Sequence, residues 1–153
     1  SIVDLGSTTR TQQGVGDYMT DAELTAFLGV HLQRLKYVFI SHPDIDHYSL
    51  FPKLNVKAGS VNAVYVGCSV KDYPDKIKDW ITNAATTAVA DPVINTAVPI
   101  CGHAAGVVVR VLASNTDVYN THPCSNGDSL VLRLEYASSS RRSGGLLGVY
   151  LRR

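Results

Sequence analysis

The feature that most constrains this chain is a short apolar run that leads directly into a segment dense in metal-ligating side chains. Residues 37–40 read Tyr-Val-Phe-Ile, and this β-branched and aromatic run, apolar on both faces, predicts a strand inside a covered parallel sheet. The segment that follows contains His42, Asp44, Asp46 and His47. Because ligand sites of α/β proteins lie beyond the carboxyl ends of parallel strands, this pattern predicts a site at one sheet edge.

Two imidazoles and two carboxylates in one short segment predict a metal site. Imidazole and carboxylate are the usual non-thiolate ligands of zinc, and manganese or iron accept such donors too. We expect His42 and Asp44 to face one ion and Asp46 and His47 another. Two ions about 3.5–4 Å apart can activate a water and clamp the oxygens of a phosphoryl or acyl centre. The competing interpretation is a solvated turn around Pro43 with both aspartates capping backbone amides.

The remainder of the chain predicts one mixed α+β domain. Its 153 residues, 45% hydrophobic and 18% charged, suffice for a single buried core. A capping-box pattern from Thr20 to Glu23 predicts the start of a helix. We expect helices at residues 21–34 and 73–84, strands at 2–5, 37–40, 62–66, 107–112, 129–136 and 146–151, and a surface loop at 113–128.

Charge and hydropathy exclude several classes of protein. Fourteen Lys and Arg against 13 Asp and Glu leave a formal charge of +1, so no overall field attracts nucleic acid or an anionic membrane, and phosphate recognition must be local. The sequence has no apolar run long enough to span a bilayer and no basic-then-apolar start. It therefore indicates a soluble domain without a signal peptide, of unspecified compartment and oligomeric state.

Three cysteines are an odd and sparse set, which argues against a disulfide framework. Two of them stand close to histidines, as Cys101 with His103 and Cys124 with His122. Two thiols and two imidazoles can form a tetrahedral zinc site, but this spacing matches no recognised zinc finger. The alternative is that Cys101 is a small buried apolar residue and that the others belong to loops.

The segment 40–47 resembles the first metal motif of the metallo-β-lactamase superfamily, and residues 2–6 resemble the strand that precedes that motif. The commoner family pattern is His-x-His-x-Asp-His, and here Asp44 replaces the second histidine. This variant resembles the metallo-β-lactamase-like domain of ComEC-type competence proteins. Residues 126–134 resemble the Asn-x-x-Ser-Leu-Val-Leu stretch of the same branch, so the resemblance covers about residues 2–136.

The resemblance implies an αββα sandwich, a dinuclear metal site and hydrolysis by a metal-bound hydroxide, with a nucleic-acid phosphodiester or a small-molecule ester as substrate. His42 and Asp44 would hold one zinc-class ion, and Asp46 and His47 the other. Asp4 would not bind a metal ion itself; its carboxylate would orient one of the ligating residues. Asp46 would also be the catalytic residue, because a carboxylate can ligate and accept a hydrogen bond from the nucleophilic water.

The chain departs from the family near its C-terminus. The family's later Gly-Asp, whose carboxylate bridges the metals, and its last histidine motif do not follow Tyr136; Val149 stands at the position of the bridging acid. The strand that normally pairs with residues 2–4 is also missing. We therefore expect a partial domain over residues 1–153, incomplete at one or both ends, with a divergent tail at 137–153. The alternative to a hydrolase is a catalytically silent binding or structural domain, or a fragment.

Overall fold

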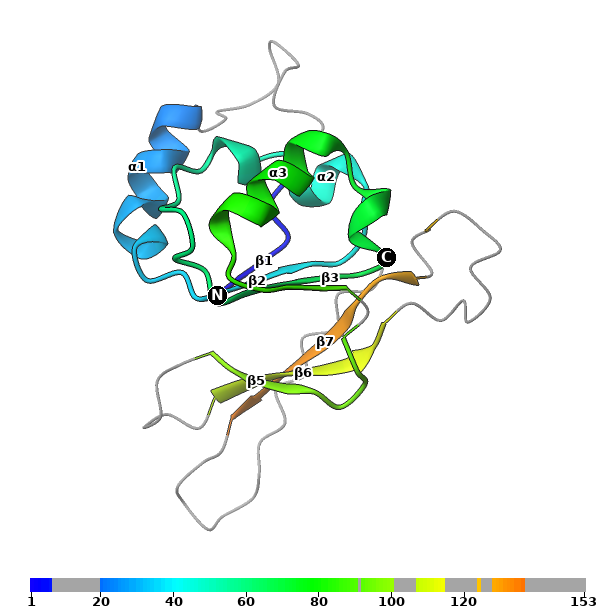
Figure 1. The fold of residues 1–153 in the computed structure, drawn as a ribbon. Coiled ribbons are helices and arrows are strands. Elements are labelled where there is room, and N and C mark those ends of the chain that lie inside the picture. Colours follow the sequence, from blue (N-terminus) through cyan, green and yellow to red (C-terminus); the bar gives the residue numbers. More distant parts are fainter. Residues whose placement is uncertain (7–19, 91, 101–106, 115–123, 125–127, 137–153) are drawn as a thin grey trace.

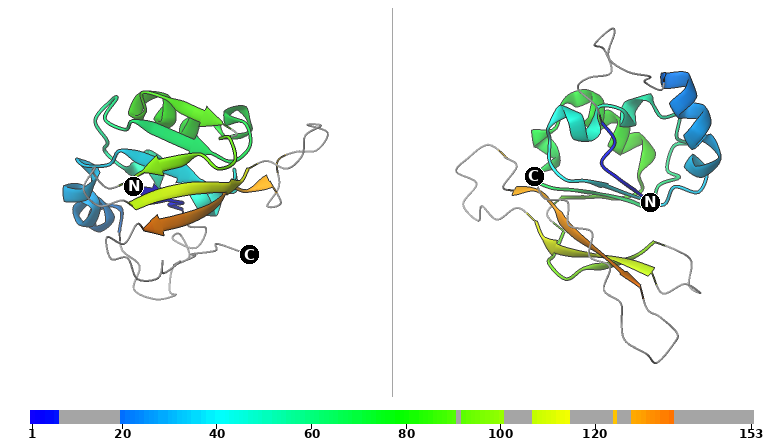
Figure 2. Two further views of the ribbon diagram at one scale, coloured as in Figure 1. Left: turned by 90° about the horizontal axis from the view of Figure 1, so that it is seen from below. Right: turned by 180° about the vertical axis from the view of Figure 1, so that it is seen from behind.

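Three layers make up the part of the chain that the structure describes, which is residues 1–6, 20–90, 92–100, 107–114, 124 and 128–136 of a computed structural model. Helices cover one face of a four-stranded sheet, and a three-stranded sheet lies against the other face (Figure 1). The turned views in Figure 2 show the same order of layers. The mixed α+β class predicted from the sequence is therefore confirmed.

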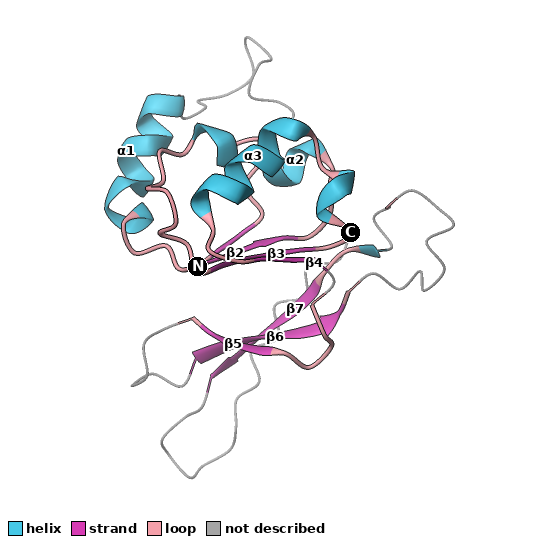
Figure 3. Ribbon diagram, viewed as in Figure 1, coloured by secondary structure: helices cyan, strands magenta, loops and turns pink. Residues whose placement is uncertain are grey.

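The first sheet is entirely parallel, and its strands follow one another in sequence order. Its strands are β1 (Ile2–Val3), β2 (Tyr37–Ile40), β3 (Ala63–Val66) and β4 (Ala88–Ala90). Val3 pairs with Phe39, and Ile40 with Val66, so β1, β2 and β3 end near the same edge. The connections between these strands carry the helices, which lie on one face of the sheet (Figure 3).

The helices begin where the sequence supplies suitable caps. In α1 (Asp21–Leu32) the Thr20 hydroxyl accepts the Glu23 N–H at 3.2 Å, and a Glu23 carboxylate oxygen accepts the Thr20 N–H at 2.7 Å. This confirms the predicted capping box. The other helices are α2 (Ile45–Tyr48) and α3 (Asp75–Ala84), with single 3₁₀ turns η1 (Phe51–Lys53) and η2 (Val70–Asp72).

Separate hydrophobic cores fill the two faces of the parallel sheet. Val38 and Ile40 point to the helix side and pack with residues of α3, whereas Phe39 points to the second sheet and packs with Val98 and Val109. The Phe39 and Tyr65 rings stack there, with centroids 5.1 Å apart. Because side chains alternate along a strand, a strand between two cores must be apolar throughout. This explains the unbroken apolar run at residues 37–40.

The second sheet is antiparallel, with the order β5-β6-β7. Its strands are β5 (Ala97–Pro99), β6 (Val107–Ala113) and β7 (Val131–Tyr136). Val109 of β6 pairs with Leu134 of β7, and both belong to the core between the sheets. β7 begins just beyond residues 128–130, so this sheet anchors a segment that passes close to the end of β2.

The structure extends and corrects the predicted elements. The strand at 37–40 is confirmed, and the helix expected at 73–84 begins at Asp75 because Pro74 is its N-cap. The structure adds α2, β4 and β5, which are too short to show a hydrophobic period. The strand expected at 146–151 and the tail at 137–153 lie outside the described residues. Among the helices described, none is both long and apolar enough to cross a bilayer.

Candidate metal centre

The candidate site lies at the carboxyl edge of the parallel sheet, where β1 and β2 end side by side. The Asp4 N–H donates to the Phe39 carbonyl at 2.9 Å, which extends the pairing of the strands by one bond. Beyond β2 come Ser41 and His42, and His47 belongs to the short helix α2. Parallel pairing thus brings Asp4 to residues that are distant from it in sequence, at the type of edge where α/β proteins bind ligands.

The carboxylate of Asp4 holds two parts of the site. One oxygen accepts the Ser41 N–H at 2.7 Å, and the other lies 2.9 Å from Nδ1 of His47. When Nδ1 of an imidazole donates to a carboxylate, Nε2 carries no proton in the neutral ring and can ligate a cation. Asp4 is therefore positioned to orient His47 as a ligand through Nε2.

His42 is 5% exposed and is held through the same ring nitrogen as His47. Its Nδ1 lies 3.0 Å from the Ser41 hydroxyl and 3.2 Å from the Ser129 hydroxyl. Its Nε2 faces the carboxylate of Asp44 at 3.2 Å. The Asp44 side chain is 57% exposed, so this pair lies where the buried site opens to solvent.

The four predicted ligands form two neighbouring pairs. His42 faces Asp44, and Nε2 of His47 lies 3.6 Å from a carboxylate oxygen of Asp46. The two imidazole rings are adjacent, with centroids 4.0 Å apart. The contacts group the four residues in the same pairs as the sequence predicts for two ions, and the ions themselves stay a prediction.

The distances within the two pairs match both a direct histidine–carboxylate contact and the spacing of two ligands on one zinc-class ion. Two donors bound at about 2.0–2.1 Å in a tetrahedral site lie about 3.4 Å apart, and the separations of 3.2 Å and 3.6 Å in the two pairs bracket this value. Among the described residues, however, three ligand atoms come within 4.8 Å of one another only at Cys68, Cys124 and Asp128. Each histidine–carboxylate pair thus offers two protein ligands to an ion.

Close backbone packing fixes α2 against the end of β1. A Cβ atom on Gly6 would lie 2.4 Å from the Asp46 carbonyl. The Leu5 N–H donates to the His47 carbonyl at 2.8 Å, and the Leu50 N–H donates to the Leu5 carbonyl at 3.1 Å. A side chain at position 6 would push α2 away, so this glycine keeps His47 within reach of Asp4.

Two tyrosines support the site from the helix side of the sheet. The hydroxyl of Tyr73 donates to the Gly67 carbonyl at 3.0 Å, and burial raises the pKa of Tyr73. The ring of Tyr48, in α2, meets that of Tyr73 edge-on at a centroid distance of 5.9 Å. Burial also raises the pKa of Tyr48, and the negative charge of Asp44 adds to this effect. Both phenols therefore remain neutral at physiological pH.

A disulfide joins Cys68, two residues beyond the end of β3, to Cys124, with Cα atoms 6.0 Å apart. The sequence analysis argued only against a framework of several disulfides, and it did not predict this single pair, because the number of cysteines does not say which of them meet. The pairing also removes Cys124 from the alternative zinc site; Cys101, His103 and His122 lie outside the described residues.

The sequence analysis assigned no role at the site to Ser41 or Ser129. Ser41 stands beside the motif, but a serine hydroxyl is a less usual metal ligand than the imidazoles and carboxylates next to it. Ser129 lies 87 residues from His42. The only sequence signal for it was its position in residues 126–134, which resemble the competence branch. The Leu130 N–H donates to the Ser41 carbonyl at 3.0 Å and brings Ser129 to the site.

Comparison with known proteins adds no family assignment. No protein-family model matches the chain, and no curated protein sequence matches it.

Proposed function

We propose that this chain is a metal-dependent hydrolase of the metallo-β-lactamase fold that cleaves a phosphodiester or a related ester. The observation that carries this proposal is the pair of adjacent histidine–carboxylate contacts, His42 with Asp44 and His47 with Asp46. They lie at the edge of a sheet where α/β proteins bind ligands. The order helices, sheet, sheet is compatible with three layers of an αββα sandwich.

In this proposal each residue has a defined task. His42 and Asp44 hold one zinc-class ion, and Asp46 and His47 hold a second; manganese or iron accept the same donors. When bound, such ions acidify water and polarise phosphoryl or acyl oxygens. Asp46 is also the catalytic residue, because its carboxylate can orient the attacking water. Asp4 keeps Nε2 of His47 directed at the ion.

The substrate is recognised locally. With a formal charge of +1 the chain has no general attraction for polyanions. Two protein ligands per ion leave coordination positions for water and for substrate oxygens. This open coordination suits either a nucleic-acid phosphodiester or a small-molecule ester.

Metal analysis of the protein without reductant tests the proposal, since the Cys68–Cys124 disulfide then stays closed. About two equivalents of zinc or manganese are expected in the wild type, with losses in His42→Ala and Asp46→Ala. Their matched controls are His31→Ala and Asp79→Ala, which remove exposed residues of α1 and α3. Hydrolysis of a generic phosphodiester should follow the bound metal, and a protein that binds neither ion contradicts the proposal.

The second candidate is a metal-binding domain of the same fold without catalysis. It is favoured by the finding that no three ligand atoms of the motif come within 4.8 Å of one another, all four residues being described. One bound equivalent of metal without hydrolysis is the result expected for this candidate.

A further inference from the structure

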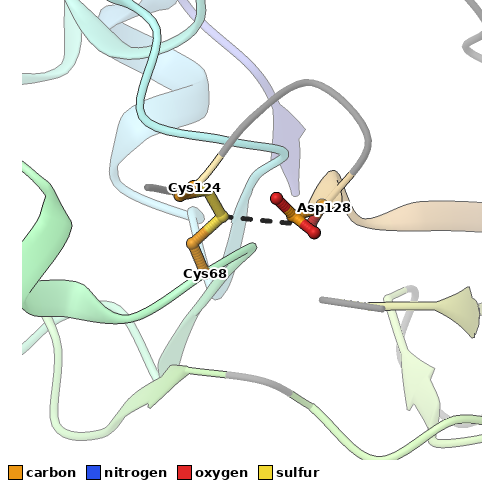
Figure 4. A group of neighbouring side chains, drawn as sticks. All are labelled: Cys68, Cys124 and Asp128. Atoms are coloured by element: carbon orange, nitrogen blue, oxygen red, sulfur yellow. Dashed lines mark hydrogen bonds between the residues drawn. A yellow bond between two sulfur atoms is a disulfide. The ribbon is translucent and has the colours of Figure 1, made fainter. Parts of the chain in front are cut away.

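A second group of ligating side chains comes together away from the histidine motif. The sulfur atoms of Cys68 and Cys124 and a carboxylate oxygen of Asp128 all lie within 4.8 Å of one another (Figure 4). Cys68 follows β3, whereas Cys124 and Asp128 belong to the segment before β7. The group therefore joins the two sheets at a position that no local sequence pattern predicts.

We infer that Cys68, Cys124 and Asp128 form a second metal site, which binds a zinc-class cation when the two cysteines are reduced. Two thiolates and a carboxylate are ligands of zinc, and a fourth position remains for water. With Zn–S bonds of about 2.3 Å in a tetrahedral site, the sulfurs lie about 3.8 Å apart. In the disulfide-bonded structure the three ligand atoms lie within 4.8 Å of one another and the two cysteine Cα atoms are 6.0 Å apart, so side-chain rotation after reduction can supply this separation.

The surroundings suit a bound cation. Cys68 is 2% exposed and Asp128 is 9% exposed, whereas Cys124 is partly exposed, so two of the three ligands are largely withdrawn from water. Charges attract more strongly in such an environment than in bulk solvent. A disulfide is neutral and needs no anionic neighbour, whereas a dication requires negative ligands. The carboxylate of Asp128 supplies one such ligand beside the two sulfurs.

The change of state balances as a thiol–disulfide exchange. A dithiol reductant supplies two electrons and two protons to the Cys68–Cys124 bond and is itself oxidised to a disulfide. The cation then displaces the thiol protons, because the thiolate is the ligating form. Oxidation reverses the sequence and expels the cation. The same two sulfurs therefore alternate between a covalent bond and a metal site.

The test of this site can be separated from the test of the proposed hydrolase. It shares no ligand with His42, Asp44, Asp46 or His47, and it requires reduced protein, whereas the histidine site does not. A probe that senses sulfur ligands alone can therefore test one site without the other.

The experiment is a titration of the reduced chain with Co²⁺, followed by its thiolate-to-cobalt charge-transfer absorption. One equivalent should produce the band in the wild type, in Cys101→Ser, which serves as the matched cysteine control, and in His42→Ala. The band should be lost in Cys68→Ser, and Asp128→Asn should bind at least about tenfold more weakly. Oxidised wild-type protein should show no band.

Two results would overturn the inference: reduced, folded wild type that gives no band, or a band that persists in Cys68→Ser. If Cys68→Ser does not fold, the inference is tested instead by the reactivity of the wild-type cysteines toward a thiol reagent. Zinc should protect two of the three cysteines from a thiol reagent, and a chelator should expose them again. Three thiols that react equally fast with zinc present would refute the site. If the protein shows the charge-transfer band but does not hydrolyse a phosphodiester, the proposed hydrolase function fails and the cysteine site stands.

Discussion

The carboxylate of Asp4 lies 2.9 Å from Nδ1 of His47, although 43 residues separate the two in sequence. Asp4 reaches this position with a φ of 42°, in the left-handed region that residues other than glycine seldom occupy. Its second oxygen accepts the Ser41 N–H at 2.7 Å. Two hydrogen bonds thus stabilise an unfavourable backbone conformation, a combination that is frequent at functional sites.

Asp4→Asn should weaken metal binding at the Asp46–His47 pair by about 10–100-fold, the usual effect of losing a carboxylate behind a ligating histidine. The amide oxygen can still accept the Ser41 N–H, so the fold should persist. Calorimetric titration of the oxidised protein with zinc measures the change. Asp79→Asn removes an equal charge from the exposed face of α3 and should bind as the wild type does. Equal affinities in both variants would show that Asp4 has no influence on the ligand.

The parts of the fold that could be predicted are those with a strong local signal. Residues 37–40 formed the expected strand because a strand between two cores must be apolar on both faces. The start of α1 followed from the side chains of Thr20 and Glu23. β4 and β5 were missed, since three-residue strands of small residues and proline show no period.

The candidate site was predictable only where its residues are neighbours in sequence. His42, Asp44, Asp46 and His47 stand in one segment, so their chemistry could be recognised from spacing. The contact of Ser129 with His42 and the disulfide of Cys68 depend on how the second sheet docks on the first. That docking is set by the core between the sheets, which local sequence patterns do not specify.

Gly67→Ala should destabilise the protein strongly. A Cβ atom at this position would lie 1.8 Å from the Ser41 carbonyl oxygen and 3.1 Å from the Leu130 nitrogen. These are backbone atoms that hydrogen-bond to each other, so the clash cannot be relieved by a side-chain rotation. We expect a loss of at least about 3 kcal/mol in the free energy of unfolding, measured by urea denaturation.

Gly29→Ala is the matched control for this substitution. A Cβ atom at position 29, inside α1, would have no atom within 4 Å. Alanine is favoured over glycine in a helix by about 1 kcal/mol, so this variant should be more stable than the wild type. Similar stabilities in the two variants would contradict the tight packing at Gly67.

Glu135 should make the second sheet sensitive to acid. Its carboxylate accepts hydrogen bonds from Arg110 at 2.7 Å and 2.8 Å and from Arg133. These bonds lower the pKa of Glu135 to about 2, from 4.5. Since the folded-state pKa is the lower one, the stabilisation is complete above pH 4.5 and is lost as the pH falls toward 2.

Urea denaturation of the wild type and Glu135→Gln between pH 6 and pH 2 measures this effect. The wild type should be the more stable protein at pH 6, and the difference should shrink as the pH falls. Added salt should reduce the difference at pH 6, because the three side chains are partly exposed and solvent ions screen them. A difference that does not change with pH would rule out ionised Glu135 as its source.

Reduction of the Cys68–Cys124 disulfide should lower the free energy of unfolding by about 2–4 kcal/mol, because the bond closes a loop between residues 56 positions apart. Urea denaturation with and without a phosphine reductant, in the presence of a chelator, measures the loss. Cys101→Ser should show the same loss on reduction, whereas Cys124→Ser should show none. The segment before β7 also brings Ser129 to His42, so reduction should weaken zinc binding at the histidine site as well. Unchanged stability on reduction would mean that the disulfide contributes nothing to the docking of the two sheets.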